Sequence, residues 1–334
     1  MDGVVACFGE VLLRFTAGDG ATLRDASRLD VHVGGAEANV AVALANLGKA
    51  TRMISALPDS ALGTLARKAL RREGVDTAHT VTRNGRMGAY FLTPAAGPRG
   101  GDVVYDRAHS AFAGLDSVDP AALDGAMHLH VSGISLAVSE ASSAATRGLA
   151  KEAKARGMSL SFDGNYRPSL WQASGRDGRG EIAEMVGMAD LFFGNHKDAT
   201  LLLGREFSGD GDTRRREAAL ALLGAYPSLQ CVASTARHIE NGTTHHIVAR
   251  IDSRAEAVEG TERILTGIVD RIGTGDVFAA GVLAGWLSDP ADLQTVVDGG
   301  AALAALKHYE PGDFCRATYQ EWVAAMQGAN DVSR

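Results

Sequence analysis

The feature of this sequence that most constrains its fold is an alternation of short apolar runs with longer, alanine-rich helical patterns. Parallel strands need crossover connections, which are usually helices. The alternation therefore predicts an α/β fold, a three-layer α/β/α sandwich around a mostly parallel central sheet. We expect strands at 4–8, 52–56, 127–131, 160–163, 190–193 and 231–234, helices at 36–47, 61–73, 142–155, 199–203 and 214–223, and a mainly helical chain after about residue 276.

Two stretches, at about residues 12–33 and 86–112, interrupt this alternation. They are richer in glycine and polar residues and contain short strand-like pieces. We expect them to pair into a small β lid over the edge of the main sheet where open α/β sheets bind ligands. The alternative is a surface hairpin without function. Apart from this lid, residues 1–334 read as one catalytic domain.

Composition excludes several classes of protein. The formal net charge of −7 argues against general binding of nucleic acid, which needs a basic surface. No apolar run approaches the roughly 18 residues that a membrane span needs. The N-terminal apolar stretch carries Glu10 and Arg14 and reads as a first core strand. With three cysteines far apart in the chain, we expect a cytoplasmic protein without disulfides.

The segment 273–276 (GTGD) carries the clearest chemistry. Gly273, Thr274 and Gly275 precede a strongly apolar helical stretch, so their N–H groups and the helix dipole would form an anion site. Asp276 at the helix start could accept a proton from an attacking hydroxyl. An ordinary helix cap is the alternative, because aspartate and glycine are common there. The P-loop, dinucleotide-binding and protein-kinase motifs are absent.

A second motif lies at residues 33–47 (VGGAEANVAVALANL), where a glycine pair leads into a helix that bears Asn39. Together with residues 270–276 (DRIGTGD), it resembles the ribokinase-like carbohydrate kinases of the PfkB family, over almost the whole chain. The resemblance implies ATP-dependent transfer of a phosphoryl group to a sugar hydroxyl, with Asp276 as the catalytic base. It also implies that Gly34 and Gly35 let the backbone approach the sugar and that Asn39 binds sugar hydroxyls.

Within this family, residues 105–111 (YDRAHSA) and 163–171 (DGNYRPSLW) are similar to the kinases of 2-keto-3-deoxygluconate. That resemblance implies phosphorylation at the terminal C6 hydroxyl. The substrate would be a sugar acid, and arginine is the side chain best shaped to hold its carboxylate. Arg107 and Arg167 are the candidates, although Arg167 could instead pair with Asp163. The remaining sugar contacts implied by the resemblance are Tyr90, Tyr105, Ile134 and Asp313.

The nucleotide site departs from the family pattern at two places. Asn195 is followed by Asp198 where the family carries a glutamate, so the predicted role of Asp198 with Mg²⁺ would run through water. A simple helix cap is the alternative. The glycine expected near residue 236 is also missing. The resemblance implies ATP and Mg²⁺, with a monovalent cation as a further candidate, and phosphate contacts from Asn195, Ser234, Thr235, Arg237, Gly273 and Gly275.

Three alternatives stay open at this point. The chain could be a kinase for a neutral sugar such as fructose or ribose. It could be a sugar-binding regulator without catalysis, which the missing glycine favours and Asp276 disfavours. An oxidoreductase would need a glycine-rich first strand–helix turn, which residues 9–12 do not supply. The resemblance also implies a homo-oligomer that associates through the lid.

Overall fold

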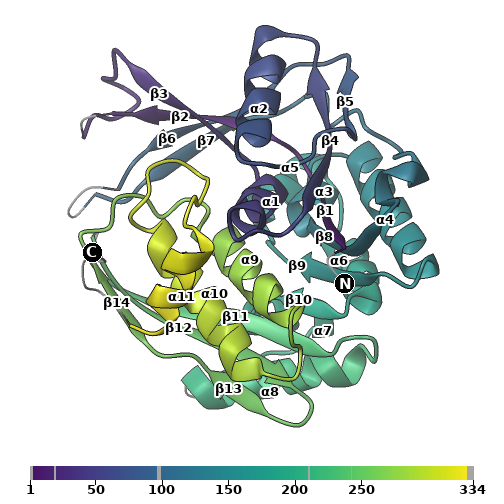
Figure 1. Cartoon of the computed structure of the whole chain (residues 1–334), viewed down its shortest axis with the longest axis vertical. Coiled ribbons are helices and arrows are strands. Elements are labelled where there is room, and N and C mark those ends of the chain that lie inside the picture. Colours follow the sequence, from purple (N-terminus) through teal and green to yellow (C-terminus); the bar gives the residue numbers. More distant parts are fainter. Residues whose placement is uncertain (1–2, 19, 96–98, 210, 242, 329–334) are drawn as a thin grey trace.

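A computed structural model describes residues 3–18, 20–95, 99–209, 211–241 and 243–328. Among these residues ten strands form one twisted sheet in the order β13-β12-β11-β10-β9-β8-β1-β4-β5, with β14 beside β12 (Figure 1). Every neighbouring pair from β11 to β5 is parallel. These strands are β1 (Val4–Phe8), β4 (Thr51–Pro58), β5 (Thr80–Arg83), β8 (Ala126–Ser132), β9 (Ser159–Asp163), β10 (Leu191–Phe193) and β11 (Cys231–Asn241).

Both faces of this sheet are buried, which explains why the central strands are continuously apolar. Successive side chains of a strand point to opposite faces. Accordingly, Val5 and Cys7 of β1 belong to one hydrophobic core, and Ala6 and Phe8 belong to the other. The predicted three-layer arrangement with a mostly parallel sheet is confirmed.

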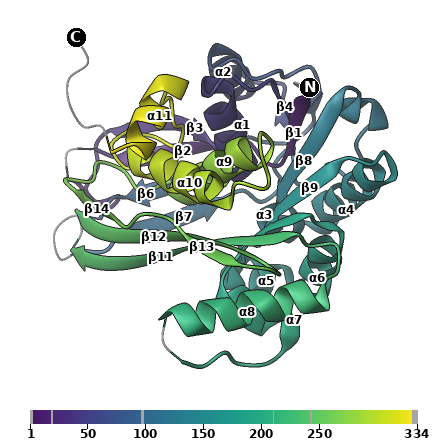
Figure 2. The same ribbon diagram turned by 60° about the horizontal axis from the view of Figure 1, so that its bottom comes forward.

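Helices cover the sheet on both sides (Figure 2). One layer comprises α1 (Ala36–Asn46), α2 (Ala61–Arg72), α9 (Thr274–Trp286), α10 (Leu293–Lys307) and α11 (Tyr319–Met326). The other comprises η1 (Pro120–Leu123), α3 (Gly133–Ala137), α4 (Glu140–Ala155), α5 (Pro168–Ser174), α6 (Gly178–Met188), α7 (His196–Leu203) and α8 (Gly211–Ala225). No helix among the described residues is long and apolar enough to cross a membrane.

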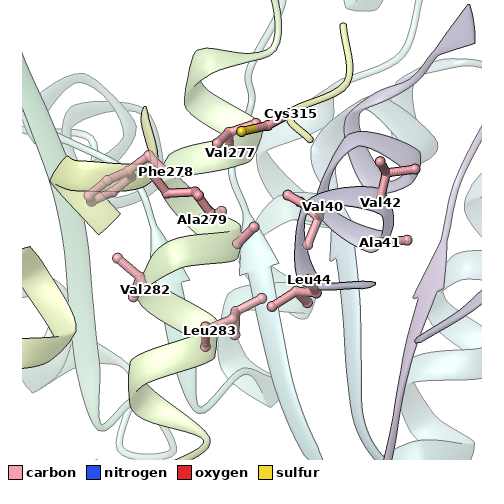
Figure 3. Close-up of a cluster of buried hydrophobic side chains, with 14 of the residues drawn as sticks. Val40, Ala41, Val42, Leu44, Val277, Phe278, Ala279, Val282, Leu283 and Cys315 are labelled. Atoms are coloured by element: carbon pink, nitrogen blue, oxygen red, sulfur yellow. The ribbon is translucent and has the colours of Figure 1, made fainter. Parts of the chain in front are cut away.

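Helices α1 and α9 lie side by side although more than 220 residues separate them in the chain (Figure 3). Val40 and Leu44 of α1 face Val277 and Leu283 of α9 in one buried cluster. Burying a side chain of this size contributes about 1.5–3 kcal/mol. This packing sets the two helix starts next to each other, which places the two motifs of the sequence in one site.

A second, smaller sheet forms the lid (Figure 1). Its order is β3-β2-β6-β7, with β2 and β6 parallel and both outer pairs antiparallel. Its strands are β2 (Leu12–Ala17), β3 (Leu29–Gly34), β6 (Gly88–Thr93) and β7 (Asp102–Asp106). The predicted small β sheet is therefore confirmed, and its strands come from the two stretches in which it was expected; residues 19 and 96–98 lie outside the described residues.

The alternation pattern does not predict the antiparallel edge of the main sheet. Strand β11 continues well beyond residue 234 and pairs along its length with β12 (Thr244–Ser253). β13 (Ala257–Glu259) and β14 (Arg263–Thr266) then pair with β12. The outer part of β11 is polar and exposed, so it lacks the apolar signal that marks the buried strands.

The three cysteines are buried and free. Cys7 lies in β1, Cys231 opens β11, and Cys315 follows the last turn before α11. Burial raises the pKa of Cys231 to about 11 and that of Cys315 to about 12, and it raises the pKa of Cys7 as well. All three are therefore neutral thiols at physiological pH.

Candidate active site

A cleft of about 730 Å³ opens between the lid and the carboxyl edge of the main sheet. It is lined by both sheets and by the starts of α1 and α9. Most of the predicted site residues meet in it. Those in the lining are Gly35, Asn39, Tyr90, Tyr105, Arg107, Ile134, Arg167, Asn195, Thr235, Arg237, Gly273, Thr274, Gly275, Asp276 and Asp313.

A neighbouring cleft of about 460 Å³ shares part of this wall. It contains Ser234 and Asp198, and it has Asn195, Arg167 and Thr235 in common with the larger cleft. Open α/β sheets bind ligands at this edge, beyond the carboxyl ends of the strands. Together the two clefts form a site in two parts, one beneath the lid and one beside β11.

Asp276 lies in the first turn of α9, behind the turn formed by residues 273–275. Gly273 has φ 80°, and a Cβ atom there would lie 2.6 Å from the carbonyl oxygen of Asp313. Only glycine satisfies both conditions. The turn therefore lies at the positive end of the α9 dipole, where backbone N–H groups can receive an anion, although the Thr274 N–H also donates to the Arg271 carbonyl oxygen at 3.4 Å.

The Asp276 carboxyl is held in place from α1. Asn39 Nδ2 donates to Asp276 Oδ2 at 2.6 Å. Burial raises the pKa of Asp276 to about 8; the hydrogen bond from Asn39 opposes this shift, and the nearby charge of Asp163 adds to it. A carboxyl with a pKa near neutrality is suited to general-base catalysis. Asn39 Oδ1 has no partner among the described residues, which leaves it free for a ligand hydroxyl.

The glycine pair has a structural reason of its own. A Cβ atom on Gly34 would lie 2.4 Å from Asp313 Oδ1, and one on Gly35, whose φ is 134°, would lie 2.2 Å from the carbonyl oxygen of Glu10. Gly34 does not line the cleft, whereas Gly35 does. The close approach at Gly34 is therefore to the protein itself, and its predicted contact with a sugar stays a prediction.

The lid contributes two aromatic rings to the cleft. The Tyr90 and Tyr105 ring centroids are 5.8 Å apart. Tyr90 is buried and its hydroxyl donates to Asp313, whereas Tyr105 is 44% exposed. Tyr90 thus belongs to the core of the lid and also lines the cleft.

Two of the predicted arginines lie in different surroundings. Arg107 is buried, and its Nε and Nη2 both donate to Glu10, which also accepts from Ser110. This pair fastens the loop after β7 to the start of β2, and the predicted contact of Arg107 with a substrate stays a prediction. Arg167 is exposed and makes no ion pair with another described residue, so it does not form the predicted alternative pair with Asp163.

Sequence reasoning missed several residues of the cleft. Arg271 lies in it beside Arg237, and neither makes an ion pair within the described part of the chain. Arg271 stands inside the 270–276 motif, so its position could have been read from the sequence. Ile247 and His308 also line the cleft, but they come from β12 and the end of α10, which carry no motif.

Asn195 and Asp198 cap α7. Asp198 Oδ2 accepts from the Asn195 N–H at 2.8 Å, and Asn195 Oδ1 accepts from the Lys197 N–H at 2.8 Å. The helix-cap alternative is thus realised, and both residues still line the second cleft. Burial, and then the charge of Asp198, raises the pKa of Asp163 to about 7. Crowded carboxyls of this kind favour a cation between them.

Among the described residues, no group of three or more His, Cys, Asp or Glu side chains could hold a metal ion by itself. Mg²⁺ usually keeps several waters and is bound through one or two carboxylates together with the phosphates of a substrate. Asp163 and Asp198 fit that kind of binding. His128 and His130 instead bond to serines of β9.

A glycine turn at a helix start, a buried carboxyl beside it and a two-part cleft are typical of enzymes that transfer a phosphoryl group to a small molecule. The family model of the pfkB family carbohydrate kinases matches residues 3–313, and the chain belongs to that family. It is therefore a carbohydrate kinase, and the family implies ATP as the phosphoryl donor.

Its similarity to known proteins extends over nearly the whole chain. The 2-dehydro-3-deoxygalactonokinase of Haloferax volcanii is 31% identical over 99% of this chain and 98% of its own. The 2-dehydro-3-deoxygluconokinase of Bacillus subtilis is 28% identical over 96% and 94%. The crystal structure of the 2-dehydro-3-deoxygluconokinase of Thermotoga maritima has a TM-score of 0.92 at 30% identity, covering 98% of this chain and 100% of that one.

Proposed function

We propose that this kinase transfers the γ-phosphoryl group of ATP to the C6 hydroxyl of 2-keto-3-deoxygluconate, giving 2-keto-3-deoxy-6-phosphogluconate. The observation that carries the proposal is the unpaired Arg167 on the same cleft wall as Asp276. A cation without a protein partner is what a sugar acid needs and what a neutral sugar does not. The names of the similar proteins support a substrate of this class.

The sugar acid binds in the larger cleft beneath the lid. Arg167 takes the carboxylate through two parallel hydrogen bonds, and Arg107, fixed by Glu10, adds positive charge to the same wall. Asn39 Oδ1 and Asp313 accept from sugar hydroxyls. Apolar and aromatic walls are supplied by Gly35, Ile134, Tyr90 and Tyr105.

The chemical step needs one proton transfer and one displacement. The hydroxyl oxygen attacks the γ-phosphorus, its O–P bond forms, and its proton passes to the Asp276 carboxylate. The bond from the γ-phosphorus to the bridging oxygen breaks, and ADP leaves with that electron pair. The N–H groups of residues 273–275 and the α9 dipole stabilise the charge that develops on the transferred group.

The nucleotide occupies the second cleft and the neighbouring part of the first. Asn195, Ser234, Thr235 and Gly275 line this region, and Arg237 and Arg271 offer two unpaired cations to the phosphates. Mg²⁺ would be held by Asp198 and Asp163 through water and would neutralise phosphate charge. The arginine pair compensates for the glycine that is missing near residue 236.

The oligomer predicted from the resemblance is also a proposal. Val31 of β3 and Val104 of β7 are 47% and 51% exposed, and they give the lid an apolar outer side. Pairing of lids between two copies would cover them. Sedimentation equilibrium of the whole chain tests this, and a monomer at micromolar concentration contradicts it.

The test of the substrate is ADP release from ATP and Mg²⁺ with five sugars. These are 2-keto-3-deoxygluconate, 2-keto-3-deoxygalactonate, gluconate, fructose and ribose. We expect the highest kcat/KM for 2-keto-3-deoxygluconate. Preference for the galactonate would keep the sugar-acid class and change the sugar. Activity on fructose or ribose alone would overturn the role of Arg167, and binding without turnover would favour a regulator.

A further inference from the structure

Lys307 is a buried cation that the chemistry above does not use. It is the last residue of α10, and its side chain is 0% exposed. Lysine is almost never fully buried unless its charge is paired. Within the described ranges, however, no carboxylate lies within ion-pair distance of its amine. Its partners are main-chain carbonyl oxygens.

Those carbonyls belong to residues 270–276 and 310–313, the two segments that form the floor of the cleft opposite the lid. Lys307 Nζ donates to the carbonyl oxygen of Glu310 at 2.8 Å and, at a longer 3.5 Å, to that of Asp270. Asp270 opens the 270–276 motif, and Glu310 opens the segment that ends at Asp313. An ammonium group has three donors and no acceptor, so a site made of carbonyl oxygens suits it.

The same two segments are joined at several other points. Gly312 N–H donates to Asp270 Oδ2 and Ile272 N–H to Asp270 Oδ1, each at 3.0 Å. Arg14 of the lid strand β2, also buried, contacts both Asp270 and Asp313. The position of the Gly273 turn thus depends on this junction, because the Asp313 carbonyl lies directly against Gly273.

Main-chain carbonyl oxygens are also the groups with which proteins bind K⁺, which exchanges its water shell for them. In this chain an ammonium group already donates to two main-chain carbonyl oxygens, at 2.8 and 3.5 Å. The negative charges of Asp270 and Asp313 favour its protonated form, although burial lowers its pKa.

We propose that Lys307 is a built-in cation that positions the 270–276 turn and takes the place of a free monovalent activator. Lys307 is a positioning residue, because it acts through the Asp270 and Glu310 carbonyls and does not line the cleft. The monovalent cation suggested by the family resemblance is then not needed. This inference rests on the kinase activity and holds for whichever sugar is phosphorylated.

The first test uses the unaltered protein with ATP as its Tris salt and the best sugar of the panel. We expect kcat in K⁺, Na⁺ and tetramethylammonium, at equal ionic strength, to agree within about twofold, since a fixed ammonium already fills the carbonyl site. Activation of roughly tenfold or more by K⁺ would overturn the proposal. A wrong sugar assignment shows itself differently, as a change of preferred sugar in every salt.

The second test compares two variants that remove the charge. Lys307→Ala leaves room for a small cation, whereas Lys307→Met fills the space with a neutral chain. We expect both to lose at least roughly tenfold in kcat, because a small displacement of catalytic groups is costly. K⁺ or methylammonium should restore Lys307→Ala and leave Lys307→Met unchanged. Lys68→Ala, an exposed lysine on α2, should behave as the unaltered protein.

A readout that needs no turnover completes the test. The Tm of Lys307→Ala should rise with K⁺ concentration, and the Tm values of the unaltered protein and of Lys307→Met should not. If both variants keep normal kcat, or if K⁺ rescues Met as well as Ala, the built-in cation is contradicted. If neither variant folds, the salt comparison on the unaltered protein decides the matter alone.

Discussion

The floor and the lid of the cleft are built in opposite ways. On the floor, Asp276 and its turn stand at the head of α9, whose residues from Val277 to Trp286 are all buried. In the lid, every residue of β7 is exposed, and Tyr105 reaches the cleft from there. Geometry that must be accurate to fractions of an ångström is thus fixed by the core. The lid strand that carries Tyr105 has less packing to hold it.

This comparison separates two kinds of effect. Substitutions on the floor should change turnover, because they alter interactions made in the transition state. Substitutions at the rim and in the lid should change the KM of the sugar, because they alter binding. Four predictions follow from it in order of decreasing size.

The largest effect is expected from Asp276→Asn. This change removes the base and keeps the shape of the side chain, so kcat should fall by roughly 10²–10⁴-fold. Steady-state kinetics measure this, and an unchanged Tm shows that the fold is intact. A turnover close to normal would show that the floor does not carry the base.

Arg167→Ala should raise the KM of the sugar acid by roughly 10- to 100-fold, because a hydrogen bond to a charged group contributes about 1.5–3 kcal/mol. The KM of ATP should change little. Arg167→Lys is the matched control, since it keeps the charge without the planar guanidinium. Its KM for the sugar acid should lie between those of the unaltered protein and Arg167→Ala. Equal changes in both KM values would make Arg167 structural.

The pH dependence of kcat/KM reports the base in the free enzyme. Burial raises the pKa of Asp276 to about 8, so the carboxyl is protonated and inactive below that pH. The rate should therefore rise with pH, about tenfold per unit on the acid side. Asp163→Asn removes a neighbouring charge that raises this pKa, so its acid limb should move to lower pH. A limb near pH 4 in the unaltered protein would contradict the assignment.

The smallest effect is expected from Tyr105→Ala in the lid. Its ring is 44% exposed and contacts the Tyr90 ring and the Arg107 guanidinium, so the loss should be about 1 kcal/mol, or a few-fold in the KM of the sugar. Neither kcat nor Tm should change measurably. Tyr105→Phe tests whether the hydroxyl matters. A large fall in kcat would mean that the lid also shapes the transition state.

Much of the fold was predictable because its signals are local. The central strands are short apolar runs, and the turn at Gly273 needs a residue that adopts positive φ. Both features depend on residues that are adjacent in the sequence. The hairpin of β11 and β12 is polar where it leaves the core, and its pairing is set by contacts rather than by pattern. The buried parallel strands could therefore be predicted from the sequence, whereas the antiparallel edge of the sheet could not.

The site divides in the same way. Asp276 could be found because the carboxylate and the glycine turn at the helix start lie together in one short motif. Arg14 could not, since its partner Asp270 lies 256 residues further along the chain. The sequence also gives no sign that Glu10 forms an ion pair with Arg107, or that Lys307 is buried. Such ion and carbonyl contacts become visible only when distant segments are folded together.

The buried thiols have a practical consequence for studying motion in this kinase. Only thiolates react readily with alkylating dyes, and all three native cysteines are protected both by burial and by raised pKa values. A single cysteine introduced at the exposed Asp102 of β7 would therefore take up a fluorophore selectively. Emission from that probe would report, in real time, whether the small sheet moves when sugar or ATP binds.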